Sequence, residues 1–288
     1  AVRQRARYSK LMADGGLGDG DLDAWLRDVE EATHRALLDL GAATGAQLSA
    51  AEPRLRSKIV MARGKSYEST TGITTWVLVT LGCQGRIVRG RPNGTWLSSQ
   101  YMWSPVETWL PDGVAAMPVD EARAEVVRRY LRTFGPATAL DVKWWTGWTA
   151  GEVKKALAGL DTAETDAGLV LADDLEPVPS PEPWAALLPA LDATPMGWKE
   201  RDFYLDPAHV PALFDRNGNI GPSVWWDGRI VGGWGQDADG AVVFRLLEDA
   251  GADARAAVEA EAERITTFLA GVRITPRFRT PLERELSS

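Results

Sequence analysis

Residues 120–172 read DEARAEVVRRYLRTFGPATALDVKWWTGWTAGEVKKALAGLDTAETDAGLVLA, three helical runs followed by two short strands. The helical runs are interrupted at Gly135-Pro136 and at Thr146-Gly147, and residues 166–168 supply the turn between the strands. Glycine and proline at such positions are typical of helix ends and turns. Three short helices closed by a two-stranded wing predict a winged helix-turn-helix, an arrangement that most often binds DNA.

The same order of elements is predicted earlier in the chain, between residues 29 and 102. A helix at Val29–Leu40 precedes a glycine-marked turn, a short helix from Gln47 and a basic helix at Glu52–Ala62. Residues 70–81 predict an additional helix or an irregular apolar segment. The basic helix is the expected recognition helix of this first unit.

A hairpin is predicted to close the first unit as its wing. Its strands are Gly85–Arg89 and Thr95–Tyr101, and Asn93-Gly94 lies in the connection. This pair supplies the positive φ angles that a tight hairpin turn requires. Residues 105–118 are interpreted as a linker to the second unit.

A Pro-rich segment at 176–183 separates the second unit from a third region. There, residues 184–192 predict a buried strand and residues 241–246 another, and Asp227-Gly228 marks a hairpin. Alanine and glutamate predict a helix at Asp253–Leu269.

The sequence therefore predicts an α+β fold with tandem winged helix-turn-helix units followed by a mixed α/β C-terminal region with a β-hairpin. The predicted parts are an N-terminal lead segment at 1–28, a first winged-helix unit at 29–110, a second at 119–175, and a C-terminal region at 184–288 with its hairpin at 222–234.

The bulk composition is that of an ordinary globular protein, with 45% hydrophobic and 25% charged residues in 288. No apolar stretch approaches the ~20 residues that span a bilayer, and no signal-peptide pattern opens the chain. We therefore expect no membrane association. The single Cys83 fits a reducing compartment, so a cytoplasmic location is predicted.

The charge of the chain is distributed unevenly. The net charge is −8, but residues 51–100 contain eight basic and two acidic side chains, which leaves −14 for the remainder. A local basic face can attract phosphates on an acidic protein, because charge effects decay within roughly 8 Å at physiological salt. The alternative is an ordinary solvated surface. The candidate DNA-binding residues of this segment are Arg54, Arg56, Lys58, Arg63, Lys65, Arg86, Arg89 and Arg91.

Other classes of site are poorly supported by the sequence. His34, His209 and Cys83 are the only histidines and cysteine, so no transition-metal cluster and no cofactor are expected. The third helix of the second unit carries only Lys154 and Lys155 against Glu152. We expect that helix to be a poorer DNA reader than the first unit.

Several stretches resemble the bacterial winged-helix DNA-binding family that includes the AlkZ-type DNA glycosylases. Their order and spacing are similar to the family's from about residue 29 to 270. The stretches are YLRTFGPAT (130–138) with WWTG (144–147), LLPALD (187–192), GWKER (197–201), DPAH (206–209) and PSVWWDGRIVGGW (222–234).

The resemblance implies tandem winged helices around a channel for double-stranded DNA, in a protein that acts as a monomer. It implies excision of alkylated or crosslinked bases, in which water hydrolyses the N-glycosidic bond at an oxocarbenium-like sugar carbon. Family members use a C-terminal β-hairpin near the duplex. Trp225, Trp226 and Arg229 are therefore further candidate DNA-binding residues.

The family's catalytic motif, Gln-x-Gln or Gln-x-Asp near the N-terminus, does not occur in this sequence. We expect the family's first winged helix to lie ahead of residue 1, and we carry over no catalytic residue. Asp192, Lys199 and Arg201 are predicted to form a polar cluster beside the site; the alternative is a structural salt-bridge group.

Two other functions compete with a glycosylase. A non-catalytic winged-helix transcriptional regulator would bind one DNA sequence, usually as a dimer. A protein-interaction module would use its winged helices for packing and leave DNA unbound.

Overall fold

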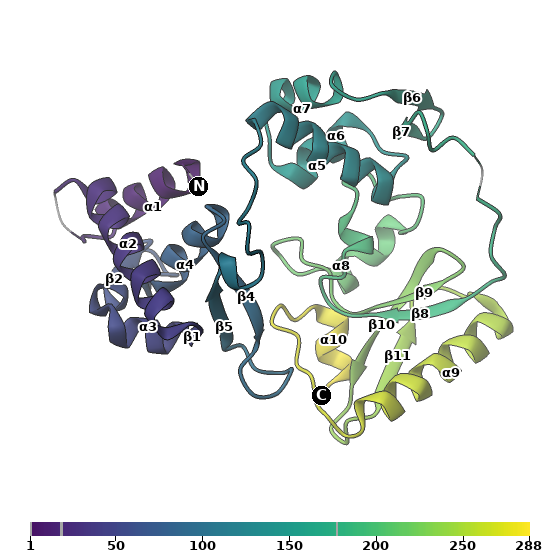
Figure 1. Cartoon of the computed structure of the whole chain (residues 1–288). Helices are drawn as coiled ribbons and strands as arrows, with labels where there is room; N and C mark the ends of the chain where they lie inside the picture. The colour runs from purple at the N-terminus through teal and green to yellow at the C-terminus, as the bar shows by residue number, and fades with distance from the viewer. Residues whose placement is uncertain (1, 18–19, 177) are drawn as a thin grey trace. The chain divides into compact units, whose positions relative to one another are not determined.

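The computed structural model describes residues 2–17, 20–176 and 178–288. The chain divides into two compact units, one ending at Ala116 and the other beginning at Met117 (Figure 1). Within the described residues, no helix is both long and apolar enough to cross a membrane.

The first unit is mainly helical, with two antiparallel hairpins. A three-stranded sheet has the order β1-β5-β4, and β2 pairs with β3 separately. The elements are α1 (Val2–Asp14), α2 (Leu22–Leu40), β1 (Ala43–Thr44), α3 (Gly45–Ala51), η1 (Pro53–Arg56), β2 (Lys58–Met61), β3 (Ser69–Gly72), α4 (Thr74–Cys83), β4 (Ile87–Pro92), β5 (Tyr101–Pro105) and η2 (Val106–Thr108).

The prediction of a basic helix at Glu52–Ala62 is wrong. The segment forms the short 3₁₀ turn η1 and then strand β2. Pro53 starts the turn, and Ile59 and Val60 are β-branched residues that favour a strand. The helix that precedes the β4–β5 hairpin is α4, which has no charged residue, so the basic side chains of 54–65 do not share a recognition helix.

The predicted hairpin exists, but its strands are displaced toward the C-terminus. The second strand starts at Tyr101 instead of Thr95, and residues 93–100 form a long connection. Asn93 N donates to Gln100 O at 2.6 Å, which closes this loop at its base. Val88 pairs with Ser104 in the register of the two strands.

The core of the first unit is formed around α2 and α4, and α1 contributes to it. Met12 is fully buried, and the ring of Tyr8 stacks on Trp76 with centroids 4.7 Å apart. The sequence reading assigned 1–28 to a lead segment and missed this helix. Buried Glu30 accepts from Arg5 and from Gln84, and so ties α1 to the end of α4.

The second unit opens with the elements predicted from 120–172. Thr138 and Thr149 each form a capping box, and Gly147 ends α6 in the left-handed region with φ 67°, which is why these boundaries could be predicted. The elements are α5 (Val119–Phe134), α6 (Ala139–Thr146), α7 (Ala150–Leu157), β6 (Thr162–Thr165) and β7 (Gly168–Leu171).

The rest of the second unit is an antiparallel sheet of order β11-β10-β9-β8 with α9 packed on one face (Figure 1). Asp227 and Gly228 both have positive φ, 45° and 80°, as the predicted Asp-Gly turn requires. The elements are β8 (Ala185–Leu188), η3 (Thr194–Met196), η4 (Pro207–His209), α8 (Val210–Leu213), β9 (Ser223–Trp226), β10 (Arg229–Gln236), β11 (Val242–Leu246), α9 (Gly251–Leu269) and α10 (Pro281–Leu286).

The two faces of this sheet belong to different cores. Val224 and Val231 point to the α9 side with Val258. Trp225 and Ile230 point to the other side, where α8, α10 and the 198–214 segment cover the sheet. This alternation is the two-residue period of a strand.

Candidate nucleic-acid interface

Two of the predicted DNA-binding arginines in the first unit are already bound by carboxylates. Arg54 donates to Glu52, with Nε and Oε1 2.8 Å apart, and to Asp28. Arg86 makes a two-point contact with Glu31. These hydrogen bonds hold the pKa of Asp28, Glu31 and Glu52 below their usual values, so both arginines stabilise the unit itself.

The other six basic side chains are exposed, and among the described residues none of them forms an ion pair. Arg89 lies over the Tyr101 ring, 4.5 Å from its centroid. Arg63 only reaches the carbonyl of Gly15, at 3.5 Å. Their charges are therefore available to an anion. The six are Arg56, Lys58, Arg63, Lys65, Arg89 and Arg91.

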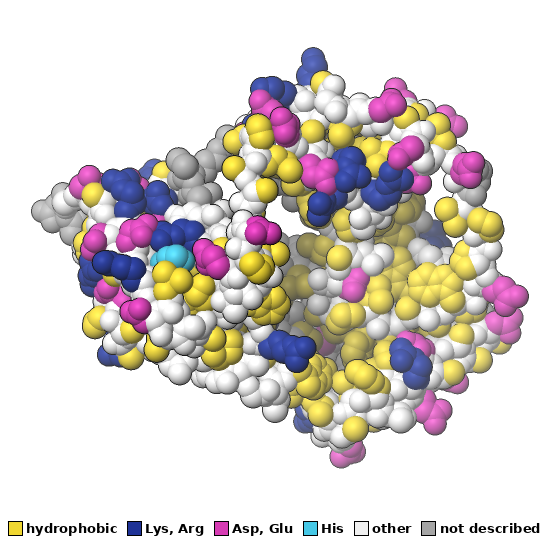
Figure 2. Space-filling view, in the orientation of Figure 1, with side chains coloured by type: hydrophobic (Ala, Val, Ile, Leu, Met, Phe, Trp, Pro, Cys, Tyr) yellow, Lys and Arg dark blue, Asp and Glu magenta, His cyan; other side chains and the backbone are white. Residues whose placement is uncertain are grey.

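These free cations come from three structural positions. Arg56 and Lys58 lie at the η1–β2 junction, Arg63 and Lys65 in the β2–β3 connection, and Arg89 with Arg91 on β4. On the face shown in Figure 2, Lys and Arg side chains alternate with Asp and Glu over the first unit. No continuous basic patch covers that visible face.

A groove of about 380 Å³ lies beside Arg89 in the first unit. Thr74 and Thr75, at the N-terminal end of helix α4, line the groove together with Arg89, so the positive end of the helix dipole lies at its edge. Tyr101 and Trp103 add aromatic surface. The lining residues are Thr44, Gly45, Ala46, Thr74, Thr75, Leu78, Val79, Arg89, Ser99, Gln100, Tyr101 and Trp103.

In the second unit, helices α6 and α7 carry three lysines, Lys143, Lys154 and Lys155. Lys155 is neutralised by Asp120 at 2.6 Å, and Arg123 binds Glu152. Lys143 and Lys154 line a shallow apolar depression of about 490 Å³ with Leu140 and Leu157. With Lys155 neutralised, Lys143 and Lys154 are the lysines of α6 and α7 that line this depression, and the expectation that the third helix is a poorer DNA reader stays a prediction.

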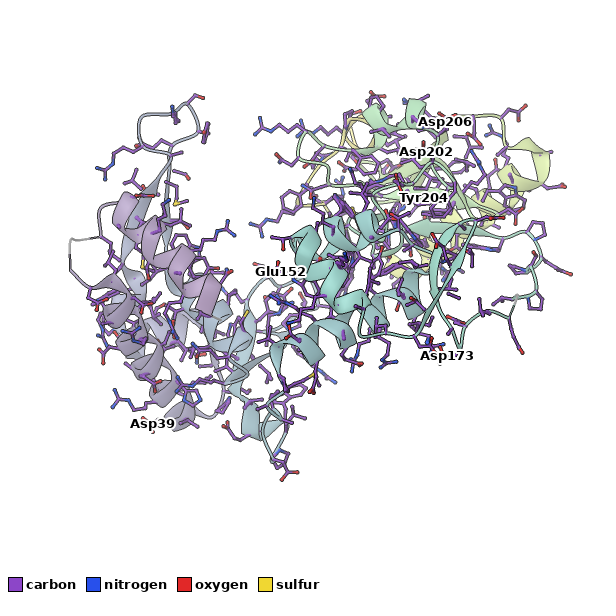
Figure 3. All side chains as sticks on the ribbon, turned by 90° about the horizontal axis from the view of Figure 1, so that it is seen from above. Asp39, Glu152, Asp173, Asp202, Tyr204 and Asp206 are labelled. Carbon is purple, nitrogen blue, oxygen red and sulfur yellow. The ribbon has the colours of Figure 1, made fainter. Side chains whose placement is uncertain are left out.

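Of the hairpin candidates, Trp225 is a core residue. It is 4% exposed, its ring stacks on Tyr204 with centroids 5.4 Å apart, and its Nε1 donates to Ser223. Tyr204, labelled in Figure 3, is itself buried, which raises its pKa to about 12. Burial of the Trp225 ring excludes base stacking in this conformation. Trp226 is half-buried on the α9 side, and Arg229 is exposed.

Replacing Trp225 by alanine is expected to lower the free energy of unfolding by about 3–5 kcal/mol, as for other buried aromatic truncations. Chemical denaturation followed by far-UV circular dichroism measures this loss. Arg229→Ala, at an exposed position on the same hairpin, is the control and should unfold like the wild type. A Trp225→Ala protein with wild-type stability and weakened DNA binding would instead assign the ring to the interface.

The predicted polar cluster does not form in the described part of the chain. Asp192 caps the backbone N of Thr194. The guanidinium of Arg201 lies between the rings of Trp144 and Phe214, 5.3 and 5.1 Å from their centroids. Lys199 is exposed beside Trp148. Asp192 and Arg201 have other partners, and no hydrogen bond or ion pair joins the three side chains within the described residues.

A different carboxylate organises this region, and the sequence reading did not identify it. Asp141 is 2% exposed and accepts four hydrogen bonds. Two come from Thr138, at 2.9 and 2.8 Å, and two from the backbone of Lys199 and Glu200, at 2.8 and 3.1 Å. Asp141 thereby joins α6 to the segment 198–201, which includes Trp198 and Arg201.

Three possible metal ligands also lie together in the second unit. The ligand atoms of Asp206, His209 and Glu248 are all within 4.8 Å of one another, and Figure 3 labels Asp206. The sequence could not predict this group, because Glu248 is distant along the chain. Asp206 caps Ala208, and His209 Nε2 lies 3.6 Å from Glu248.

Comparison with known proteins places the chain among DNA-repair glycosylases. Residues 1–268 match the family model described as DNA glycosylase AlkZ-like, and the chain belongs to this family. The solved structure of the Streptomyces sahachiroi DNA glycosylase AlkZ is similar in fold, with a TM-score of 0.64 and 23% identity over 95% of this chain and 77% of that one. No curated protein sequence matches.

Proposed function

We propose that the chain binds double-stranded DNA as part of an AlkZ-like base-excision reaction on alkylated bases. The observation that carries the proposal is the set of six exposed, unpaired cations in the described residues of the first unit, on a chain of net charge −8. Family membership supports DNA as the substrate, and the resemblance described above implies alkylated bases. Guanidinium and ammonium groups without protein partners are the groups that neutralise backbone phosphates.

We further propose that both sets of short helices act as winged helix-turn-helix units. In the second unit, α5, α6 and α7 are followed by the β6–β7 hairpin, which supports this interpretation. In the first unit, α2, α3 and α4 are followed by β4 and β5. Arg89 and Arg91 would then lie on a wing, where side chains reach phosphates or the minor groove.

The chemistry proposed is hydrolysis of the N-glycosidic bond. A positively charged alkylated base is a good leaving group, so the enzyme mainly has to hold the duplex and orient water at the sugar carbon. The exposed glutamine Gln100 lines the groove beside Arg89, but neither it nor any other residue is assigned as the catalytic group.

Two measurements on one duplex test this function. A labelled duplex containing a single N7-alkylguanine is incubated with the chain, and bound DNA and released base are quantified separately. Retention of the duplex at submicromolar protein supports DNA binding, and time-dependent base release supports hydrolysis by this chain. Absence of binding to both the alkylated and the unmodified duplex contradicts the proposal.

DNA footprinting separates the glycosylase from a transcriptional regulator. Binding dominated by backbone contacts should protect random genomic fragments diffusely, because phosphate contacts carry little sequence information. One protected palindrome would instead favour a regulator.

A further inference from the structure

The second unit contains an arginine-lined concavity that the sequence did not reveal. It has a volume of about 800 Å³ and lies between the loop after α8 and the segment leading into α10. Its walls come from two segments at least sixty positions apart in sequence. The lining arginines are Arg216, Arg277, Arg279 and Arg284.

Three of these four guanidinium groups have no carboxylate partner among the residues that the structure describes. Arg279 is bound by buried Glu283, with two contacts of 2.7 and 2.9 Å. Arg216 and Arg284 are exposed and form no ion pair there. Arg277 has only the ring of Phe278, 5.8 Å from its centroid.

The two carboxylates of the concavity are occupied by other groups. Asp215 accepts from the backbone of Asn217 and from the backbone and side chain of Asn219, at 2.8–2.9 Å. Glu285 binds Arg245 at 2.6 Å. Asp215 keeps its negative charge beside Arg216, but the four lining arginines outnumber the two lining carboxylates, so the concavity keeps a net positive charge.

From this geometry we infer that the concavity is a second phosphate-binding site, which holds the sugar-phosphate backbone of the DNA. The inference rests on the proposed function and adds an anchor that the first unit does not provide. Planar guanidinium groups bind phosphate oxygens with paired hydrogen bonds. The concavity is wide and open, which suits a polymer backbone passing through it better than an enclosed small ligand.

The test compares a double variant, Arg216→Gln with Arg284→Gln, with the wild-type chain. Both positions are exposed, so folding should be unchanged, and thermal unfolding verifies this. Each phosphate contact contributes about 0.9 to the slope of log K against log salt. We therefore expect the slope for an unmodified duplex to fall by about 1.8 and the affinity at low salt to fall at least tenfold.

A matched control loses the same charge elsewhere in the second unit. Arg255→Gln with Arg264→Gln changes two exposed arginines on α9, away from the concavity, and should retain the wild-type slope. Wild-type binding with equal slopes in both variants overturns the inference while DNA binding by the chain stands. Absence of wild-type binding contradicts the proposed function itself.

A competition arm identifies the source of the phosphate. Inorganic phosphate is added at fixed ionic strength, which is maintained with chloride. Little displacement of DNA from the wild type at millimolar phosphate supports a polymer backbone as the ligand. Phosphate that stabilises the wild type but not Arg216→Gln with Arg284→Gln against thermal unfolding, while both proteins bind DNA equally, would assign the concavity to the free anion instead and overturn the inference.

Discussion

The double charge reversal Arg89→Glu with Arg91→Glu is expected to weaken binding to an unmodified duplex about 100-fold at 100 mM salt. Hydrogen bonds to charged groups contribute about 1.5–3 kcal/mol each, and every 1.4 kcal/mol is a tenfold change in affinity. Both arginines are exposed on β4 without a carboxylate partner among the described residues. Fluorescence anisotropy with a labelled duplex measures the dissociation constants.

The control for this variant is a matched reversal on the acidic side of the same unit. Arg27→Glu with Arg35→Glu alters two exposed arginines of α2. It changes the net charge by the same amount, so a general electrostatic effect would appear in both variants. If Arg89→Glu with Arg91→Glu weakens binding less than threefold, or no more than the control, β4 does not contact the phosphates.

Asp141→Asn is expected to destabilise the second unit by at least about 2 kcal/mol at pH 7. Each carboxylate oxygen accepts from two donors. In asparagine one of these oxygens is replaced by an NH₂ group, which cannot accept the two hydrogen bonds made there. Leaving buried donors unsatisfied costs about 1–3 kcal/mol each. Urea unfolding measures the loss, and Asp166→Asn, at an exposed position in the β6–β7 connection, should have no effect.

The stability difference between the wild type and Asp141→Asn should depend on pH in one direction. Burial raises the pKa of Asp141, but the hydrogen bonds from Glu200, Thr138 and Lys199 outweigh it, and the net pKa lies below the usual value. The unfolded carboxyl titrates near about 3.9. The stabilisation is therefore fully present above that pH and is lost as the pH falls through the depressed folded pKa.

Unfolding free energies of the two proteins at pH 7, 5, 4 and 3 test this dependence. The difference should be constant from pH 7 to pH 5 and should shrink below pH 4. A difference that grows on acidification would mean that the protonated form of Asp141 is the one that the fold prefers.

The helices of the second unit could be predicted because their signals are local. Thr138 and Thr149 cap the helices that follow them, and Gly147 ends α6. Asp227 and Gly228 likewise determine the β9–β10 turn from two adjacent residues. Such boundaries depend on backbone groups within four residues of the side chain, so the sequence alone is sufficient.

The candidate DNA-binding residues were harder to predict because ion pairs form over long sequence distances. Arg86 binds Glu31, which is 55 residues away, and Arg54 binds Asp28. A count of charges along 51–100 treats both as free. The basic helix failed for a different reason, since Pro53 and the β-branched pair Ile59-Val60 outweigh its helical residues.

The arginines of the second-unit concavity show the opposite case, in which residues that give no signal in the sequence are brought together by folding. Arg216 and Arg284 are isolated in the sequence and carry no motif that predicts a site. Folding brings them to one concavity, while the neighbouring acids Asp215 and Glu285 bind other groups. Only the tertiary structure separates free charges from neutralised ones.

The salt dependence of duplex binding tests the central claim most directly, namely that unpaired cations of this acidic chain neutralise DNA phosphates. The association constant for an unmodified duplex is measured between 50 and 200 mM sodium chloride. With six or more phosphate contacts, we predict a loss of about 10³-fold or more across this range. Submicromolar binding that is unchanged across the range, or no binding at 50 mM, would contradict the account.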